Sequence, residues 1–252
     1  MNKKALVLIP SRYQSTRFPG KPLADISGRP MVQWTYEGCC KIQEHFPDSV
    51  VAVVTDNDEV EKVVKGFGGN CVRVDDDVPS GTERINLAYQ RFYQDQHFDL
   101  VINVQGDEPL IEYELIENLI NFHSENEFDV ATVVKEISVH DDGYNDSNKV
   151  KAIYSKRTGR CNYFTRCSFP YNRNNEEGVH WFLHVGIYSF LPEVLAKFCE
   201  YQQSHNEVIE CLEQLRLLDN GHSIGAVETT MHLCGVDTPE DIKYVEGIID
   251  GK

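Results

Sequence analysis

The chain has 252 residues, 41% of them hydrophobic, and a formal net charge of −16 at pH 7. This length and hydrophobic content can bury a full core and favour one large α/β domain, or such a domain with a small insertion. The acidity argues against non-specific nucleic-acid binding, and no run of Lys or Arg indicates a membrane surface. An anionic ligand would therefore be met by a local basic pocket or a metal ion.

The cysteines and the first residues indicate the compartment. The eight cysteines include no C-x-x-C pair, and Cys39 and Cys40 are adjacent, which is poor geometry for a disulfide. Met-Asn-Lys-Lys leads into only five apolar residues, which is too short for a signal segment or a spanning helix. We expect a cytoplasmic protein with reduced thiols.

The apolar residues 5–9, bounded by Pro10, predict a buried parallel strand. The loop after it carries Arg12, Arg17 and Lys21 among hydroxyl side chains, glycine and prolines. Cations neutralise the charge of a polyphosphate, hydroxyl groups donate hydrogen bonds to it, and a glycine lets main-chain N–H groups approach it closely. Such groups after a first strand therefore favour polyphosphate binding. The loop matches neither G-x-x-x-x-G-K-[ST] nor G-x-G-x-x-G, so side chains would do most of the binding. The alternative is a solvated basic loop.

Strands and helices alternate along the first half of the chain. Further strands are predicted over 50–55, 71–74 and 100–104, and helices over 31–41, 58–65 and 84–94. This alternation predicts a mostly parallel, Rossmann-like sheet with helices on both faces. In such a sheet the loops at 75–84 and 105–109 lie at the same strand edge as the basic loop.

From residue 129 the pattern changes to short strands and polar loops. Strands are predicted over 130–134, 150–154, 162–165 and 182–188, with polar loops at 141–148 and 173–178. They favour a small inserted lobe or extra strands. Helices over 192–201 and 208–220, a strand over 223–228 and a final helix capped by Thr238 complete the chain.

Asp107 and Asp237 are the candidate metal ligands. Asp107 follows a glycine at the end of a predicted strand, and Asp237 lies in Val-Asp-Thr-Pro. Mg²⁺ takes oxygen ligands, uses one or two carboxylates and completes its shell with phosphates and water. Each aspartate has a structural alternative, because Asp107 could cap a helix and Asp237 could terminate a loop. Only their convergence in space decides between these roles.

Seven segments together resemble one family. They are residues 9–23, Ser80-Gly-Thr-Glu-Arg84, Val104-Gln-Gly-Asp-Glu-Pro109, Tyr163-Phe-Thr-Arg166, His184-Val-Gly-Ile-Tyr188, Leu212-Glu-Gln-Leu-Arg216 and residues 235–241. Their order resembles that in the 3-deoxy-manno-octulosonate cytidylyltransferases, or CMP-Kdo synthetases, and the likeness spans residues 5–246.

The resemblance implies a cytosolic, magnesium-dependent enzyme that converts CTP and the sugar acid Kdo into CMP-Kdo and pyrophosphate for lipopolysaccharide or capsule synthesis. It implies a homodimer, and the composition predicts no nucleic-acid or membrane partner. The chain would be a single nucleotidyltransferase domain, 1–252, with a sugar-binding and dimerisation insertion at about 136–205.

The resemblance also implies roles for individual residues. Arg12, Arg17 and Lys21 would bind the triphosphate, with Ser80, Gly81 and Thr82 near the nucleotide, and Asp107 and Asp237 would hold Mg²⁺. Arg12, Lys21 and the two aspartates would form the catalytic set. The sugar acid site would be lined by Arg84, Gln105, Arg166, His184, Tyr188, Glu213 and Gln214.

These assignments agree with the chemistry. The anomeric hydroxyl of the sugar acid attacks a triphosphate, so the reaction brings two anions together. The enzyme must therefore position both substrates and neutralise their charge rather than form a covalent intermediate. An arginine such as Arg166 can bind a sugar carboxylate through two hydrogen bonds. His184 lies in an apolar strand, where it could equally be a core residue, and we do not expect a general base there.

Departures from the family pattern concentrate on the sugar side. Ser11, Thr165 and Leu183 stand where the family more often has Ala, Ser and a basic residue, and residues 189–191 are Ser, Phe and Leu. The acceptor could therefore be a relative of Kdo, such as 8-amino-Kdo.

Two other classes are open alternatives. In a metal-dependent glycosyltransferase, residues 75–77 would act as a D-x-D motif, but no departing pyrophosphate would need three cations. A non-catalytic nucleotide binder would gain little from keeping two metal-binding aspartates.

Overall fold

The computed structural model describes residues 3–14, 18–138 and 140–251. The chain divides into two compact units, residues 1–117 with 231–252 and residues 118–230. The boundary falls within helix α4 (Tyr113–Glu125), a helix that the sequence patterns did not predict. No helix of the described residues is long and apolar enough to cross a membrane.

The first unit contains four parallel strands in the order β5-β4-β1-β6. They are β1 (Ala5–Pro10), β4 (Val50–Thr55), β5 (Cys71–Arg73) and β6 (Leu100–Asn103). Residues 5–9 are fully buried in the central strand β1, as a run of apolar residues without alternation predicts. The strands predicted for this half of the chain are confirmed to within one residue.

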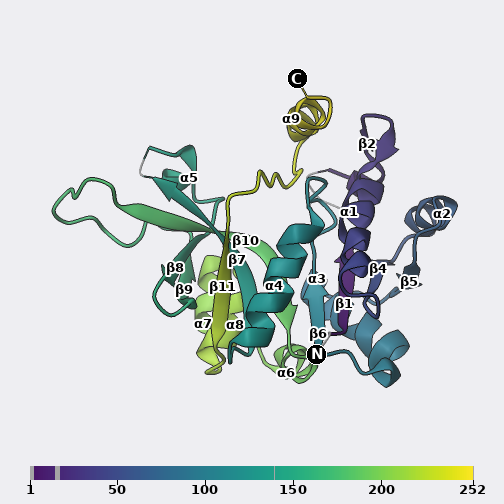
Figure 1. Cartoon of the computed structure of the whole chain (residues 1–252), viewed down its shortest axis with the longest axis horizontal. Helices are drawn as coiled ribbons and strands as arrows, with labels where there is room; N and C mark the ends of the chain where they lie inside the picture. Colours follow the sequence, from purple (N-terminus) through teal and green to yellow (C-terminus); the bar gives the residue numbers. More distant parts are fainter. Residues whose placement is uncertain (1–2, 15–17, 139, 252) are drawn as a thin grey trace. The chain divides into compact units, whose positions relative to one another are not determined.

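Helices and short turns connect these strands (Figure 1). The connecting helices are α1 (Met31–Cys40), α2 (Asp58–Gly66) and α3 (Gly81–Ala88), with helical turns η1 (Lys21–Leu23), η2 (Lys41–Glu44), η3 (Tyr89–Tyr93) and η4 (Gln94–Gln96). Helix α9 (Pro239–Ile249) also belongs to this unit and is the last element of the described chain. A hairpin joins β2 (Asp25–Ile26) and β3 (Arg29–Pro30). Helices α1 and α2 pack on β4, and α3 packs on β1, β4 and β6.

A small apolar cluster ties the C-terminal segment to the start of the chain. Ile26, Met31, Val236 and Val245 are fully buried together. As predicted, Thr238 caps helix α9: its side chain accepts a hydrogen bond from the main chain of Asp241. The cluster fixes the residues around position 237 within the first unit, although they are distant in sequence from the other loops of that unit.

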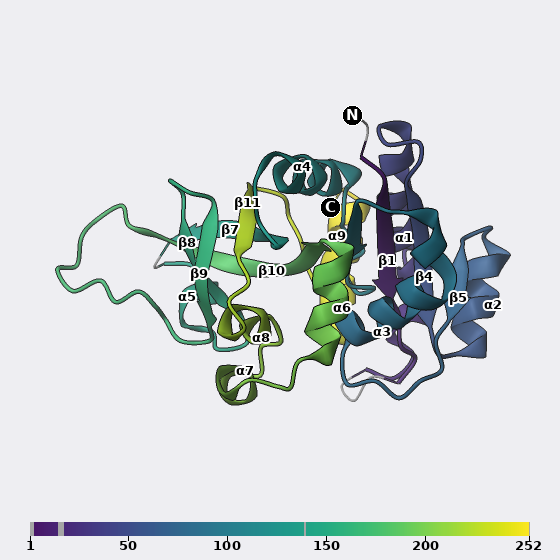
Figure 2. The same ribbon diagram turned by 90° about the horizontal axis from the view of Figure 1, so that it is seen from below.

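The second unit contains a mixed set of strands in the order β10-β7-β11-β9-β8, and β8 also pairs with β10 (Figure 2). The strands are β7 (Val130–Ser138), β8 (Lys151–Ser155), β9 (Arg160–Thr165), β10 (His180–Phe190) and β11 (Ile224–Thr229). Among the described residues of this unit only β7 and β11 run parallel. The predicted strands are confirmed here, but the predicted parallel arrangement describes the first unit alone.

The helices of the second unit correct one prediction. They are α5 (Asp142–Asn145), α6 (Pro192–Glu200), α7 (His205–Glu210) and α8 (Gln214–Asp219). The single helix predicted over 208–220 is wrong, because Cys211 adopts a left-handed conformation, φ 52°, and ends α7. The spacing of the apolar residues continues across the break, and a cysteine does not indicate the left-handed conformation as glycine or asparagine does.

Candidate active site

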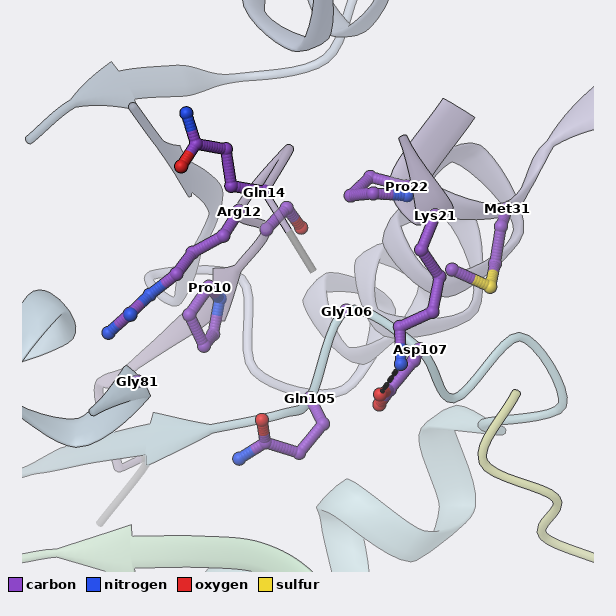
Figure 3. Close-up of a pocket in the computed structure, with 11 residues that line it drawn as sticks. Pro10, Arg12, Gln14, Lys21, Pro22, Met31, Gly81, Gln105, Gly106 and Asp107 are labelled. Atoms are coloured by element: carbon purple, nitrogen blue, oxygen red, sulfur yellow. Dashed lines mark hydrogen bonds and ion pairs between the residues drawn. The ribbon is translucent and has the colours of Figure 1, made fainter. Parts of the chain in front are cut away.

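A cavity of about 340 Å³ lies in the first unit where β1 ends (Figure 3). Its walls come from the loop after β1, the start of α3 and the segment after β6. The lining residues are Pro10, Ser11, Arg12, Gln14, Lys21, Pro22, Met31, Gly81, Gln105, Gly106 and Asp107. The structure thus confirms that the loops after the first strand and after β6 converge at one edge of the sheet.

Gly106 lets these two loops approach closely. A Cβ atom at this position would lie 2.5 Å from Ser11 Oγ and 2.8 Å from the carbonyl oxygen of Pro10. A Cβ atom does not come this close to an oxygen atom of another loop in folded proteins, so a side chain at position 106 would push the two loops apart. The loop after β6 can therefore approach the loop after β1 this closely only with glycine at position 106. The next residue in the chain is Asp107, whose position therefore depends on Gly106.

Lys21 connects the two predicted metal ligands. Its Nζ lies 2.5 Å from Asp107 Oδ2 and 3.3 Å from Asp237 Oδ1. The main-chain N–H of Val236 donates a hydrogen bond of 2.9 Å to the carbonyl oxygen of Asp107, which brings the two acidic segments together. Burial alone would lower the pKa of Lys21, but the carboxylates of Asp107 and Asp237 outweigh it and raise that pKa. Asp107 and Asp237 therefore lie close together within the first unit, and their binding of a metal ion stays a prediction.

Glu108 adds a third carboxyl group that the sequence analysis missed. Its Oε2 is buried with no hydrogen-bond partner among the described residues. Burial, followed by the negative charges of Asp107 and Asp237, raises the pKa of Glu108 to about 8. The only signal in the sequence was the position of Glu108 next to Asp107, and adjacent acidic residues in loops usually face the solvent.

This charge balance fits a divalent cation. One lysine ammonium lies between the two carboxylates of Asp107 and Asp237, which leaves local negative charge uncompensated even while the nearby Glu108 carboxyl group is protonated. The side chains of Asp107 and Asp237 are 30% and 56% exposed, so an ion can reach their oxygens from solvent. The described residues hold no cluster of three or more His, Cys, Asp or Glu side chains arranged as metal ligands. Two carboxylates alone would suit Mg²⁺, which takes one or two carboxylates beside phosphate and water.

The other residues predicted for the nucleotide have mixed surroundings. Arg12 Nη2 donates a hydrogen bond of 2.6 Å to the carbonyl oxygen of Val78 and also lines the cavity. Ser80 caps helix α3 through a reciprocal pair of hydrogen bonds with Glu83, and Thr82, in the first turn of that helix, is buried. Their contacts with a nucleotide stay predictions.

Arg17 lies outside the described residues, so its predicted contact with the triphosphate also stays a prediction.

Arg84, predicted on the sugar side, is buried in the first unit. Its guanidinium donates hydrogen bonds to the carbonyl oxygens of Val74 and Asp76 and pairs with Asp56 Oδ2 at 3.1 Å. These bonds tie the loop after β5 to helix α3. A contact with a sugar stays a prediction for Arg84, as it does for Gln105, which lines the cavity.

His184 of the second unit is a neutral, structurally engaged side chain. Its Nε2 lies 3.0 Å from Thr132 Oγ1, and Thr132 donates its own proton to the carbonyl oxygen of Ile187 at 2.7 Å. The rings of Phe164 and Tyr188 pack against the imidazole. Burial lowers the pKa of His184 to about 3, so the ring carries no charge at pH 7. A charged contact with a substrate does not fit this environment.

Tyr188, Glu213 and Gln214 also belong to the second unit. Burial and the nearby charge of Glu213 raise the pKa of the Tyr188 hydroxyl. Gln214 is buried, and its Nε2 has no hydrogen-bond partner in the part of the chain that the structure describes. A buried amide donor in that state is stabilised when a ligand oxygen accepts its hydrogen bond. Contacts of all three residues with a sugar stay predictions.

Parallel strands end at a cavity that two cations and Asp107 line, with Asp237 joined to it through Lys21, an arrangement that suits an α/β enzyme of the nucleotidyltransferase class. The cytidylyltransferase family model matches residues 6–224. The chain belongs to that family, and within it to the 3-deoxy-manno-octulosonate cytidylyltransferases.

Relatives of this name match the chain along nearly its full length. The relative from Cytophaga hutchinsonii is 38% identical over 250 residues, which cover 97% of each chain. The relative from Photobacterium profundum is 41% identical over 251 residues, which cover 96% of this chain and 98% of its own.

Solved structures agree with this assignment. The structure of CMP:2-keto-3-deoxy-manno-octonic acid synthetase complexed with CTP is 35% identical, has a TM-score of 0.89 and covers 99% of each chain. A 4-diphosphocytidyl-2C-methyl-D-erythritol synthase from Anaerococcus prevotii, 14% identical with a TM-score of 0.63, shares the fold alone.

Proposed function

We propose that this chain activates the sugar acid Kdo by converting CTP and Kdo into CMP-Kdo and pyrophosphate. The observation that carries the proposal is the contact of Lys21 with both Asp107 and Asp237 at the edge of the cavity. Membership of the family and the full-length relatives support the same reaction.

The residues of the first unit would neutralise the triphosphate. Arg12, Arg17 and Lys21 would bind its anionic oxygens and the departing pyrophosphate, since this chemistry depends on positioning and charge cancellation. Asp107 and Asp237 would hold Mg²⁺, which when bound supplies a divalent positive charge to the phosphate oxygens. Gly106 would keep Asp107 close to the loop after β1.

In the second unit, Arg166 would bind the sugar carboxylate, with Tyr188 and Gln214 donating to ring hydroxyls. The described residues offer Arg166 main-chain carbonyl acceptors and no ion pair with a carboxylate. Its charge is therefore available to an anionic ligand. We assign His184 a packing role beside this site, because its ring is neutral and hydrogen-bonded to Thr132.

Asp75, one of the two ligand positions of the D-x-D motif considered above, is engaged elsewhere, and so is the middle residue Asp76. Asp75 pairs with Arg73 at 2.5 Å, and Asp76 accepts two hydrogen bonds from Arg91. These pairs disfavour a glycosyltransferase metal site at residues 75–77.

We further propose a cytoplasmic enzyme that acts as a homodimer in lipopolysaccharide or capsule synthesis. The eight cysteines all lie in the described ranges and none of them forms a disulfide there, which supports a reducing compartment. Residues 136–205 would supply the sugar-binding and dimerisation insertion; they lie within the second unit.

The test is a coupled pyrophosphate-release assay with CTP or UTP and with Kdo, 8-amino-Kdo or sialic acid as acceptor. We expect the highest kcat/KM with CTP and Kdo. Faster turnover of 8-amino-Kdo would change the acceptor but keep the reaction. Absence of pyrophosphate release with every sugar acid would overturn the proposed function.

A further inference from the structure

Three main-chain carbonyl groups hold the guanidinium of Arg166. Nε donates to the carbonyl oxygen of Glu210 at 2.7 Å, Nη1 to that of Ser147 at 3.0 Å and Nη2 to that of Cys211 at 3.4 Å. A guanidinium has five N–H donors, so two are left for a ligand. The side chain is thus fixed in direction while its charge stays uncompensated by a carboxylate within the described residues.

The side chain of Glu210 makes a further contact with Arg166, in addition to the one made by its main-chain carbonyl group. Its Oε2 accepts a hydrogen bond of 2.9 Å from the main-chain N–H of Arg166, and its Oε1 accepts one of 2.6 Å from the Thr165 hydroxyl. Glu210 therefore contacts both the backbone and the side chain of Arg166. The Glu210 carboxylate therefore binds the main chain of Arg166 and not its guanidinium. The positive charge of the guanidinium is not neutralised by this carboxylate.

The conformation of Cys211 makes this double contact possible. Helix α7 ends at Glu210, and the left-handed Cys211 turns the chain there. The carbonyl groups at the end of a helix lack partners within the helix and carry partial negative charge. Those of Glu210 and Cys211 both accept hydrogen bonds from Arg166.

A buried lysine fixes the third carbonyl group. Lys151 is fully buried, and its Nζ donates to the carbonyl oxygens of Asp146 at 2.8 Å and Lys149 at 2.6 Å. These bonds hold the loop that contains Ser147. Both segments that contact the Arg166 guanidinium are therefore held in place by other bonds.

We infer that Glu210 is a positioning residue for Arg166, which it orients toward the carboxylate of the sugar acid. This inference rests on the proposed function, because it takes a sugar acid as the ligand of Arg166. It predicts that Glu210 controls the affinity for the acceptor and has no effect on CTP.

The test compares Glu210→Gln with the wild type. An amide has one acceptor oxygen and one donor nitrogen in place of two acceptors, so it cannot accept hydrogen bonds from both the Arg166 N–H and the Thr165 hydroxyl, as Glu210 does. We expect the KM for Kdo to rise about tenfold or more, with the KM for CTP and the kcat at saturating Kdo nearly unchanged. Glu200→Gln, an exposed acid at the end of α6, is the matched control and should match the wild type.

A double-mutant cycle with Arg166→Lys separates positioning from a general structural role. If Glu210 acts through Arg166, Glu210→Gln should add little to the KM for Kdo in the Arg166→Lys background. Equal effects of Glu210→Gln in both backgrounds, or equal losses for CTP and Kdo, would overturn the inference and leave the proposed function standing. A wild-type enzyme that turns over no sugar acid would overturn both.

Discussion

The Lys21 ammonium lies 2.5 Å from Asp107 Oδ2, and the two residues are 86 positions apart in the sequence. The same ammonium lies 3.3 Å from Asp237 Oδ1. Lys21 contacts both proposed metal ligands, so its positive charge partly neutralises the same two carboxylates that a divalent cation would neutralise. Lysine and metal should therefore compete for these oxygens, and bound metal would leave Lys21 available for phosphate.

Replacement of Lys21 by methionine tests this competition. We expect Lys21→Met to bind Mn²⁺ about tenfold more tightly than the wild type in the absence of nucleotide, because the carboxylates lose their positive partner. Electron paramagnetic resonance of free Mn²⁺ measures that affinity without turnover. The same variant should have a higher KM for CTP. Arg12→Met is the control for the loss of a cation, and Mn²⁺ affinity equal in Lys21→Met and the wild type would exclude competition.

His184 makes stability depend on pH. Its pKa in the folded protein is lowered to about 3, whereas an unfolded histidine titrates near 6.5. As the pH falls from 6.5 toward 3, the unfolded chain gains a proton that the folded chain does not, so the free energy of unfolding decreases. This contribution to stability is fully present above pH 6.5.

Urea unfolding at pH 7 and pH 5 measures this dependence. Between these values the wild type should lose up to about 2 kcal/mol more than His184→Gln, which keeps a donor toward Thr132. His232→Gln, at an exposed position, should behave as the wild type. Identical pH dependence in wild type and His184→Gln would contradict the low pKa.

Gly106→Ala should displace the loop that carries Asp107. The new Cβ would lie 2.5 Å from Ser11 Oγ and 2.8 Å from the Pro10 carbonyl oxygen, so the loop must move. We expect the free energy of unfolding to fall by about 1–3 kcal/mol and kcat/KM to fall with it. Gly66→Ala is the matched control, because Gly66 lies in helix α2 and an added Cβ there would have no atom within 4 Å. Wild-type activity in Gly106→Ala would show that the close approach is unnecessary.

The sequence allowed the first half of this site to be predicted. Apolar runs without alternation indicated β1 and β6, and parallel strands place the loops that follow them at one edge. Lys21 and Asp107 could therefore be expected near each other before the structure was known. The approach of Asp237 to these residues could not be derived from strand patterns. It depends on the burial of Val236 and on the hydrogen bond from the main-chain N–H of Val236 to Asp107.

Other features left no readable pattern. Glu108 looks like a surface acid in the sequence, and its burial depends on tertiary packing. Arg84 lies in a segment typical of the family, yet its guanidinium is used for internal contacts with the loop after β5. The break at Cys211 was missed because the apolar spacing of one helix serves two short helices equally well.

The most direct test of the proposed metal site uses Asp107→Asn and Asp237→Asn, with Asp95→Asn at an exposed position as the control. Mn²⁺ binding in the presence of CTP and pyrophosphate release with CTP and Kdo would be measured on the same preparations. We predict that each of the first two variants binds Mn²⁺ at least tenfold more weakly and turns over about a hundredfold more slowly than the control. Wild-type Mn²⁺ affinity and turnover in either variant would contradict the assignment of these two carboxylates.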